Sequence, residues 1–294
     1  MVDVMVRKKI LKIQERLGMR LGLAYGTKKT PVVRNSKDML DTLQELYNIG
    51  LKAFVLPSQM FAGIQTASDL YKSKYGELLK IKDEAKRYNI ELTVRFPNLP
   101  QEPDETMRIY STIASIMDCR NFIIQPNFYS KIMPHDQALK LAVFKINEVI
   151  SNMSHKIKVG IETTGTIGDV GSLEDVIDIV RRTHNTEPVI NWGHIQGREK
   201  GTLQSRRDFN LMLNQLRETV GRGYFQSVYF LFSAVRYGKN GYIESIPYAK
   251  GDINLEHMIR ESMSAGAKGT LIIEDPDREA FILRIMDQLA DMVR

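Results

Sequence analysis

The stretch IKVGIETTGTIGDVGSLEDVIDIVRRTHNTEPVINWGH (residues 157–194) contains one complete strand–helix–strand unit. Residues 157–163 and 188–193 are short runs rich in β-branched and apolar residues, which is typical of strands buried on both faces. Between them, Ser172 precedes a helical pattern and Asp175 follows three residues later, a signature of a helix start. Because strands that alternate with helices pair in parallel, this unit indicates an α/β protein.

The same alternation continues in both directions along the 294-residue chain. The strand-like runs span residues 19–25, 51–57, 90–96, 121–127, 157–163, 188–193, 227–233 and 270–275. Eight such units over about 275 residues predict a single (β/α)₈ TIM barrel, an α/β fold. Residues 1–18 predict a short N-terminal helical extension with Ile10, Ile13 and Leu17 on one face, so we expect the barrel to span residues 19–294.

An open doubly wound sheet is the alternative architecture. Such sheets usually carry a glycine-rich phosphate turn after the first strand. Here the first turn reads GLAYGTKKTPVV, which has neither the GxGxxG nor the P-loop spacing. The closed barrel is therefore the prediction.

Composition restricts the class of protein further. The chain is 43% hydrophobic and 26% charged, as soluble globular proteins are. The one cysteine, Cys119, excludes an intramolecular disulfide and suits a reducing compartment. No apolar run approaches the roughly 20 residues that cross a bilayer, and charges interrupt the first residues throughout. We expect a cytoplasmic monomer with no membrane contact.

The net charge of +6 permits binding to a polyanion but does not establish it.

Polar residues at the carboxyl ends of the strands are the candidates for a functional site, because TIM barrels build active sites on that face. Glu162 and Glu274 are the sharpest pair. They suit a divalent metal or an acid–base pair, or alternatively ion pairs with an arginine. His194 suits a metal ligand, a proton shuttle or a hydrogen bond to loop backbone. The strand-end residues are Tyr25, Arg95, Gln125, Glu162, Asn191, His194, Ser233, Arg236 and Glu274.

Three long stretches after strands are expected to be irregular: residues 165–171, 193–202 and 233–252. The last of them mixes basic and aromatic residues, which suits phosphate contacts and base or sugar stacking. A solvated charged loop is the alternative interpretation. The residues concerned are Arg236, Tyr237, Lys239, Tyr242, Tyr248 and Lys250.

The succession of GIETTG, the GSLEDV helix and INWGH resembles the endonuclease IV family, which are apurinic/apyrimidinic endonucleases within the xylose-isomerase-like TIM barrel group. The resemblance runs from MRLGLAY to the last helix, and the tail SAVRYGKNG…GAKGTLIIEDP is similar to archaeal members. It implies a barrel that flips an abasic sugar of duplex DNA into its mouth. It also implies phosphodiester hydrolysis by three zinc ions held by histidines and carboxylates.

Most of the zinc ligands that the resemblance implies are replaced in this chain. The third-strand and fourth-strand histidines, the sixth-strand aspartate and the seventh-strand histidine correspond to Arg95, Gln125, Asn191 and a position at or near Leu231. An arginine is a fixed cation and cannot ligate zinc, and amide oxygens bind zinc weakly. The three-zinc cluster is therefore not expected.

Glu162, His194 and Glu274 are the retained ligands. They imply at most one weakly held divalent ion, zinc, manganese or magnesium. A buried Arg95 could instead take the space and charge of the missing metal by pairing with Glu162, or it could contact a phosphate.

Three functions remain open on this reading. The first is a metal-poor nuclease in DNA repair that acts on abasic duplex DNA, with Glu162, His194 and Glu274 as catalytic residues. The second is a non-catalytic nucleic-acid-binding protein. The third is a sugar isomerase or epimerase in which the two glutamates are acid and base. The expected substrate- and phosphate-binding residues are Arg95, Gln125, Asn191, Ser233, Arg236, Tyr237 and Lys239.

Overall fold

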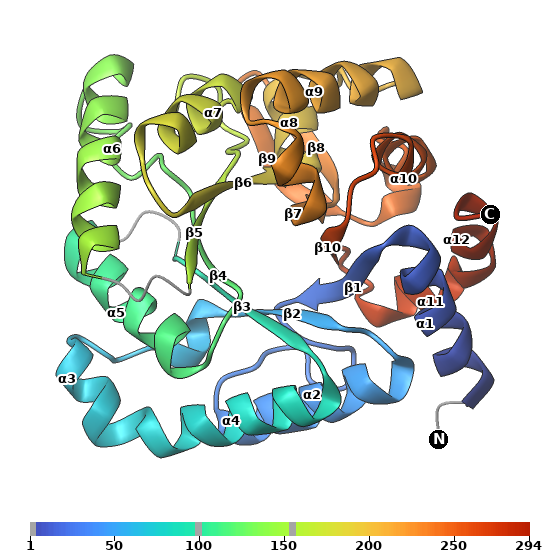
Figure 1. The fold of residues 1–294 in the computed structure, drawn as a ribbon, viewed down its shortest axis with the longest axis horizontal. Helices are drawn as coiled ribbons and strands as arrows, with labels where there is room; N and C mark the ends of the chain where they lie inside the picture. Colours follow the sequence, from blue (N-terminus) through green and yellow to red (C-terminus); the bar gives the residue numbers. More distant parts are fainter. Residues whose placement is uncertain (1–3, 98–101, 153–156) are drawn as a thin grey trace.

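Eight parallel strands close into a barrel in the computed structural model, which describes residues 4–97, 102–152 and 157–294 (Figure 1). The order around the barrel is β1-β10-β7-β6-β5-β4-β3-β2. This confirms the predicted (β/α)₈ TIM barrel. The barrel strands are β1 (Met19–Ala24), β2 (Ala53–Leu56), β3 (Glu91–Arg95), β4 (Asn121–Ile124), β5 (Lys158–Glu162), β6 (Thr186–Asn191), β7 (Val228–Phe232) and β10 (Gly269–Ile273).

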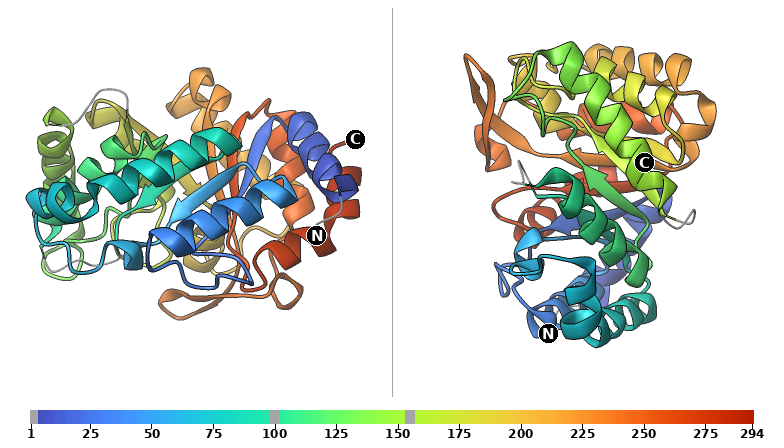
Figure 2. Two further views of the ribbon diagram at one scale, coloured as in Figure 1. Left: turned by 90° about the horizontal axis from the view of Figure 1, so that it is seen from below. Right: turned by 90° about the vertical axis from the view of Figure 1, so that its left-hand side faces the viewer.

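Helices surround the barrel (Figures 1 and 2). Their starts follow local signals: Ser172 accepts a hydrogen bond from Asp175 N and forms the predicted capping box. The helices are α1 (Val4–Leu17), α2 (Ser36–Ile49), α3 (Ala67–Asp69), α4 (Tyr75–Tyr88), α5 (Pro103–Ile116), α6 (His135–Ser151), α7 (Leu173–Arg182), α8 (Trp192–Arg198), α9 (Arg206–Thr219), α10 (Leu255–Ser264), α11 (Glu279–Arg284) and α12 (Met286–Met292). A π-helical turn (Leu70–Lys74) joins α3 to α4.

The N-terminal extension is helical from Val4 onward, and Ile10, Ile13 and Leu17 are buried as predicted. Gln14, also buried, fixes this helix to the barrel. Its side-chain amide donates to Gly50 O at 2.7 Å, and its Oε1 accepts from Leu21 N at 2.8 Å. Residues 1–3 of the predicted extension lie outside the described residues.

The apolar core has two layers. The larger layer lies between the strands and the helices. The smaller layer is formed by strand residues alone and fills the barrel interior: Ala24, Ala53, Val55, Ile123, Val189, Tyr229, Leu231 and Ile272. Leu231, at or near the position where the resemblance to endonuclease IV implies a seventh-strand histidine, is fully buried in this interior layer.

Two of the stretches predicted to be irregular are ordered elements, so those predictions are wrong. Residues 192–198 form α8, because the Asn191 side chain accepts a hydrogen bond from His194 N at 3.1 Å and caps the helix. Residues 234–246 form an antiparallel hairpin of β8 (Ala234–Gly238) and β9 (Gly241–Ile246). Figure 2 shows this hairpin projecting from one end of the barrel. Within the described ranges, no helix is long and apolar enough to cross a membrane.

Candidate functional site

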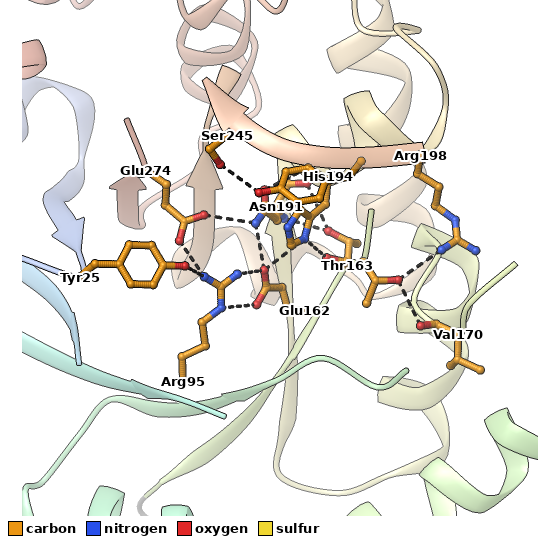
Figure 3. A network of polar contacts seen from close by, with 12 residues as sticks. Tyr25, Arg95, Glu162, Thr163, Val170, Asn191, His194, Arg198, Ser245 and Glu274 are labelled. Atoms are coloured by element: carbon orange, nitrogen blue, oxygen red, sulfur yellow. Dashed lines mark hydrogen bonds and ion pairs between the residues drawn. The ribbon is translucent and has the colours of Figure 1, made fainter. Parts of the chain in front are cut away.

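Four of the predicted site residues meet at the carboxyl end of the barrel (Figure 3). Arg95, Glu162 and Asn191 are the last residues of β3, β5 and β6, and Glu274 directly follows β10. Parallel strands in a closed barrel bring such residues together from distant parts of the chain. The structure brings these four side chains together, and they are hydrogen-bonded to one another.

The guanidinium of Arg95 lies between the two carboxylates. Its Nε donates to Glu162 Oε2 at 2.8 Å, and its Nη2 is bonded to Glu162 Oε1, so this pair is bidentate. Its Nη1 donates to Glu274 Oε1 at 2.7 Å. The pairing of Arg95 with Glu162, one of the two roles considered from the sequence, is confirmed.

This ion cluster is almost closed to solvent. The side chains of Arg95, Glu162 and Glu274 are 12%, 0% and 6% exposed. Burial by itself would raise the pKa of Glu162, but Arg95 and His194 outweigh burial and hold that pKa below its usual range. Burial would lower the pKa of Arg95, and the two glutamates reverse this and hold it above its ordinary value. Arg95 and Glu162 therefore form a permanent ion pair at neutral pH.

Asn191 and His194 complete the polar cluster. The Asn191 amide donates to Glu162 Oε1 at 2.9 Å and to Glu274 Oε2 at 3.4 Å, so it bridges the two carboxylates. The His194 Nδ1 lies 2.7 Å from the Thr163 carbonyl oxygen and 3.3 Å from Glu162 Oε1. Because a carbonyl oxygen only accepts, Nδ1 carries a proton.

Tyr25 follows β1 and forms the outer wall of the cluster. Its hydroxyl accepts from Arg95 Nη1 at 2.7 Å, which leaves its own proton available to another oxygen. Arg95 alone would lower the pKa of Tyr25, but Glu274, burial and Glu162 raise it above its ordinary value, so the phenol stays protonated. The backbone φ of Tyr25 is +69°, a conformation that bulky residues rarely adopt. Such strain is typical of functional sites.

A pocket of ≈230 Å³ opens above the cluster. The hairpin covers one side of it: Tyr242 and Ser245 of β9 line the pocket, and the Tyr242 ring packs edge-on against His194 at 4.9 Å. Backbone hydrogen bonds from Tyr242 N to Gly165 O and from Ile167 N to Asn240 O fix the hairpin to the loop after β5. The polar lining residues are Tyr25, Ser58, Arg95, Gln125, His194, Tyr242, Ser245 and Glu274.

The donor set does not suit a metal ion in this arrangement. The carboxylates that would hold the ion already coordinate the fixed cation of Arg95. Among the described residues, no three histidine, cysteine or carboxylate side chains are grouped as metal ligands are. A divalent ion at Glu162, His194 and Glu274 would have to displace the Arg95 guanidinium. The single weak metal site therefore stays a prediction, without geometric support.

The other predicted phosphate-binding residues separate into two groups. Gln125 lines the pocket. Ser233 is 2% exposed and packs behind the pocket against Gly193. Arg236 pairs with Glu244 across the hairpin at 2.7 Å, and Tyr237 donates to Asp252. Lys239 lies at the exposed hairpin turn. The structure therefore does not bring Ser233, Arg236, Tyr237 or Lys239 into the pocket.

Two polar pocket residues, Ser58 and Ser245, have no role assigned from the sequence, and Tyr242 has one only as part of the basic, aromatic stretch. For the two hairpin residues, a signal is present in the sequence. Asn-Gly is a dipeptide typical of β-hairpin turns, and here Asn240-Gly241 lies between two runs in which polar and apolar residues alternate. The alternation then places Tyr242 and its neighbours on defined faces of β9. Ser58 lies in a short 3₁₀ turn after β2 and carries no comparable signal.

Comparisons with known proteins agree with the fold. No family model matches the sequence. An uncharacterised protein of Methanocaldococcus jannaschii, MJ0133, is 22% identical over 260 residues, covering 86% of this chain and 92% of the relative. At this identity, membership of the endonuclease IV family stays a prediction.

Solved structures with the same fold come from both enzyme classes considered above. A D-tagatose 3-epimerase-like protein superposes with a TM-score of 0.63 at 14% identity, covering 94% of this chain and 98% of its own. A family 2 AP endonuclease from Brucella melitensis gives 0.60 at 15% identity, with 87% and 92% covered. A zinc-bound IOLI protein gives 0.61 at 12%, with 94% and 95% covered. The chain shares its TIM-barrel fold with these proteins, and these likenesses show the fold alone.

Proposed function

We propose that this protein binds a small, uncharged, polyhydroxylated carbonyl compound of sugar size and transfers a proton next to its carbonyl group without a metal ion. The observation that carries the proposal is the guanidinium of Arg95, held between Glu162 and Glu274 at the barrel mouth. A pocket of ≈230 Å³ lined with hydroxyl, amide and imidazole groups lies directly above it. Hydroxyl-rich ligands can exchange hydrogen bonds with water for hydrogen bonds with such a lining.

The charge of the site favours a neutral ligand. The ion cluster of Arg95, Glu162 and Glu274 contains one guanidinium and two carboxylates, so these three side chains carry a net charge of −1. Four hydrogen bonds from Arg95 are already directed at its own partners, which leaves little of its donor capacity for a ligand. Burying an anion beside uncompensated negative charge is costly. A phosphorylated ligand is therefore disfavoured in this pocket.

Two proteins with the same fold are sugar epimerases, and this similarity of fold supports the proposal of a sugar-like ligand. Among them, one is described as a D-psicose 3-epimerase solved with D-fructose, and another as a D-psicose 3-epimerase solved with D-tagatose. Both cover 94% of this chain. The pocket of the present protein is formed at the same, carboxyl-terminal face that TIM barrels use for catalysis.

Glu274 is the group that we assign as the base. One of its oxygens is held by Arg95, whereas the other, among the residues that the structure describes, has only a long hydrogen bond of 3.4 Å from Asn191. In the proposed step, Glu274 removes the proton from the carbon next to the carbonyl group. The electron pair of that C–H bond forms a C=C bond, and the π pair of the carbonyl group moves onto its oxygen. A proton from water then enters the same carbon from the other face as the carbonyl group re-forms, and Glu274 releases its proton to water. The step inverts that carbon and needs no oxidant or reductant.

We assign Tyr25 as the hydrogen-bond donor to the carbonyl oxygen of the ligand, on which negative charge develops during the reaction. Its hydroxyl accepts from Arg95 and can therefore donate into the pocket. A hydrogen-bond donor fixed before the reaction stabilises negative charge on an oxygen, which is the task that a metal ion has in related chemistry. His194, which also lines the pocket, is a second group that could transfer a proton. Glu162 keeps Arg95 in place rather than reacting.

Deuterium incorporation tests this function. EDTA-treated protein is incubated in D₂O with D-fructose, D-tagatose or D-psicose, and proton NMR follows the signal at the carbon next to the carbonyl group. We expect deuterium to enter at least one neutral sugar, and Glu274→Gln to slow this by about 10²-fold or more. No incorporation with any neutral ketose or aldose, or incorporation that requires an added divalent metal, would overturn the proposal.

A second candidate function is recognition of an abasic site in DNA, in which the same pocket would take the flipped deoxyribose. The observation in its favour is the exposed hairpin beside the pocket, with Lys239 at its turn. One structural relative is described as an AP endonuclease. Hydrolysis of a phosphodiester, however, needs positive charge at the phosphate, and the buried cluster carries net negative charge.

Binding and nicking of an abasic duplex decide between the two candidates. Under the DNA hypothesis, the protein binds abasic duplex more tightly than intact duplex, and Lys239→Ala weakens binding with a shallower salt dependence. Nicking would have to appear with magnesium, manganese or zinc. Equal, weak binding to both duplexes and no nicking with any of the three metals would remove this candidate.

A further inference from the structure

A second pocket lies at the opposite, amino-terminal end of the barrel. It measures ≈340 Å³ and is lined by the start of β1, the end of α4, the start of β3 and the segment before β4. Its charged lining residues are Arg20, Lys82, Lys86, Glu91, Asp118 and Arg120. None of them belongs to the site described above.

Two guanidinium groups form the fixed part of this pocket. Arg20 donates three hydrogen bonds to the backbone and side-chain oxygens of Asn89, at 3.0 to 3.1 Å. Asn89 adopts a left-handed conformation at the end of α4, with φ +54°, which directs both of its oxygens to Arg20. Three bonds from five N–H donors leave part of the Arg20 fork available.

Arg120 is held by neutral oxygens and by carboxylates. It donates to Thr270 Oγ1 at 2.8 Å and to Ser227 O at 2.6 Å, and its side chain is 15% exposed. Glu91 lies between the two arginines, 3.7 Å from Arg20 and 3.5 Å from Arg120, and compensates for one positive charge. Glu187, which lies 3.6 Å from Arg120, is itself paired with Lys158 at 3.3 Å, so this second pair adds no net charge. Groups already held in position lose little conformational entropy when a ligand binds.

The two lysines supply uncompensated charge. Lys82 and Lys86 are four residues apart on α4 and therefore share one face of the helix. No hydrogen bond or ion pair of either side chain is found among the described residues. With four cationic and two acidic side chains, the lining carries a net charge of +2. At the same end of the barrel, burial and then the charges of Arg7 and Arg20 lower the pKa of Lys52.

We propose that this pocket binds a small dianion of the phosphate-monoester class. Its net charge of +2 matches a dianion, and ≈340 Å³ is large enough for a phosphate with a small organic group attached. Arginine forks and lysines are the side chains that bind phosphate oxygens in proteins. The site is separate from the pocket above Arg95 and does not depend on the function proposed for that pocket.

Calorimetric titration with inorganic phosphate at constant ionic strength tests the proposal. The pocket variant is Lys82→Ala/Lys86→Ala. The matched control is Lys37→Ala/Lys80→Ala, which removes the same charge from exposed positions outside the pocket, one of them on the same helix. Melting temperatures of all three proteins confirm that each is folded. We expect saturable one-site binding to the wild type, an affinity at least about tenfold weaker in the pocket variant, and a change below about twofold in the control.

Three outcomes would overturn the proposal. Phosphate could fail to bind the wild type saturably. Phosphate could bind the pocket variant as tightly as the wild type, which would place the anion elsewhere. Both variants could lose affinity equally, which would show non-specific attraction to a basic protein. Because the assay uses no sugar and no catalytic readout, its result does not depend on whether the deuterium experiment succeeds.

Discussion

At the scale of single residues, Arg95 determines the character of the site. A metal ion at the same position would accept electron pairs from the carboxylates and from a ligand oxygen. The guanidinium can only donate hydrogen bonds, and most of its donors are already directed at Glu162, Glu274 and Tyr25. Its influence on a ligand therefore passes through Tyr25, whose hydroxyl it polarises. Its charge is also independent of pH in the physiological range.

Arg95→Met should destabilise the protein in a pH-dependent manner. In the wild type the pKa of Glu162 is lowered, so the stabilisation from Glu162 is present above the ordinary glutamate pKa and is lost as the pH falls through the lowered value. In the variant, two buried carboxylates lose their cation, and burial favours their protonated forms. We expect a loss of about 3–5 kcal/mol at neutral pH, which becomes smaller towards about pH 5 as the carboxylates take up protons.

Urea denaturation of both proteins at the two pH values measures this difference. Arg236→Met is the control, because the exposed pair of Arg236 with Glu244 should contribute about 1 kcal/mol or less at either pH. A loss for Arg95→Met that stays constant, or that increases as the pH falls, would show that the buried carboxylates do not depend on Arg95.

Tyr25→Phe tests the role of the phenol proton. The variant keeps the ring and loses only the hydroxyl that accepts from Arg95. We expect the maximal rate of deuterium incorporation to fall by about 10²-fold, while the sugar concentration at half-maximal rate changes by about twofold or less. Tyr71→Phe, at a residue 57% exposed and outside the pocket, should leave both values unchanged. If Tyr25→Phe instead raised the sugar concentration at half-maximal rate and left the maximal rate unchanged, Tyr25 would contribute to sugar binding alone.

At the scale of elements, the hairpin is the part of the site that sequence reasoning missed. Its sequence mixes charged, aromatic and glycine residues, which predicts an irregular basic loop. The pattern that indicates a hairpin is the dipeptide Asn240-Gly241; in the structure Lys239 and Asn240 form the turn, and Gly241 begins β9 and pairs with Gly238. As a hairpin, residues 234–246 pair their own charges, with Arg236 on Glu244, and direct Tyr242 to His194. The basic character that suggested DNA contact is therefore partly neutralised within the element.

Gly241→Ala should loosen the hairpin without unfolding the barrel. Gly241 has φ +95°, and a Cβ there would lie 2.2 Å from Gly165 O, on the loop that fixes the hairpin. We expect faster hydrogen exchange in residues 234–246 and a lower rate of deuterium incorporation into the sugar. Gly63→Ala is the matched control, because φ is +86° but nothing lies within 4 Å of the added Cβ. Its cost should be backbone strain alone, about 1 kcal/mol. Equal hydrogen exchange of the hairpin in both variants would contradict this role of Gly241.

The strands and the strand-end glutamates could be predicted because each depends on local pattern. Apolar runs predict strands, and residues after them must lie at one end of a closed barrel. The direction of Arg95 could not be predicted in this way. It is the last residue of β3, and whether its long side chain turns inward depends on Glu162 and Glu274, which are 67 and 179 residues away in the sequence. Contacts at such separations follow from the closed barrel and not from neighbouring residues.

At the scale of the whole molecule, the two ends of the barrel differ in charge. The cluster at the carboxyl end carries net −1, and the pocket at the amino end carries net +2. The overall charge of +6 therefore does not describe either site. An anionic ligand is favoured at the amino end and disfavoured above Arg95.

The negative charge of the cluster at the carboxyl end predicts that the pocket above Arg95 prefers neutral sugars to sugar phosphates. We expect D-fructose, or whichever neutral sugar incorporates deuterium, to react at least about 10²-fold faster than its phosphate ester, because burying a dianion above the cluster costs several kcal/mol. Proton NMR in D₂O with each compound measures the ratio. A phosphate ester that incorporates deuterium as fast as the neutral sugar would contradict the charge argument, whatever binds at the amino end.

The most direct test of the account is whether a metal ion can occupy the site while Arg95 is present. Manganese is titrated into EDTA-treated protein, and the free ion is followed by its EPR signal. With Arg95 held by both glutamates, we predict no stoichiometric binding up to about 1 mM, and deuterium incorporation that manganese does not change. One tightly bound manganese ion per chain that is lost in Glu162→Ala would contradict the replacement of the metal by an internal guanidinium.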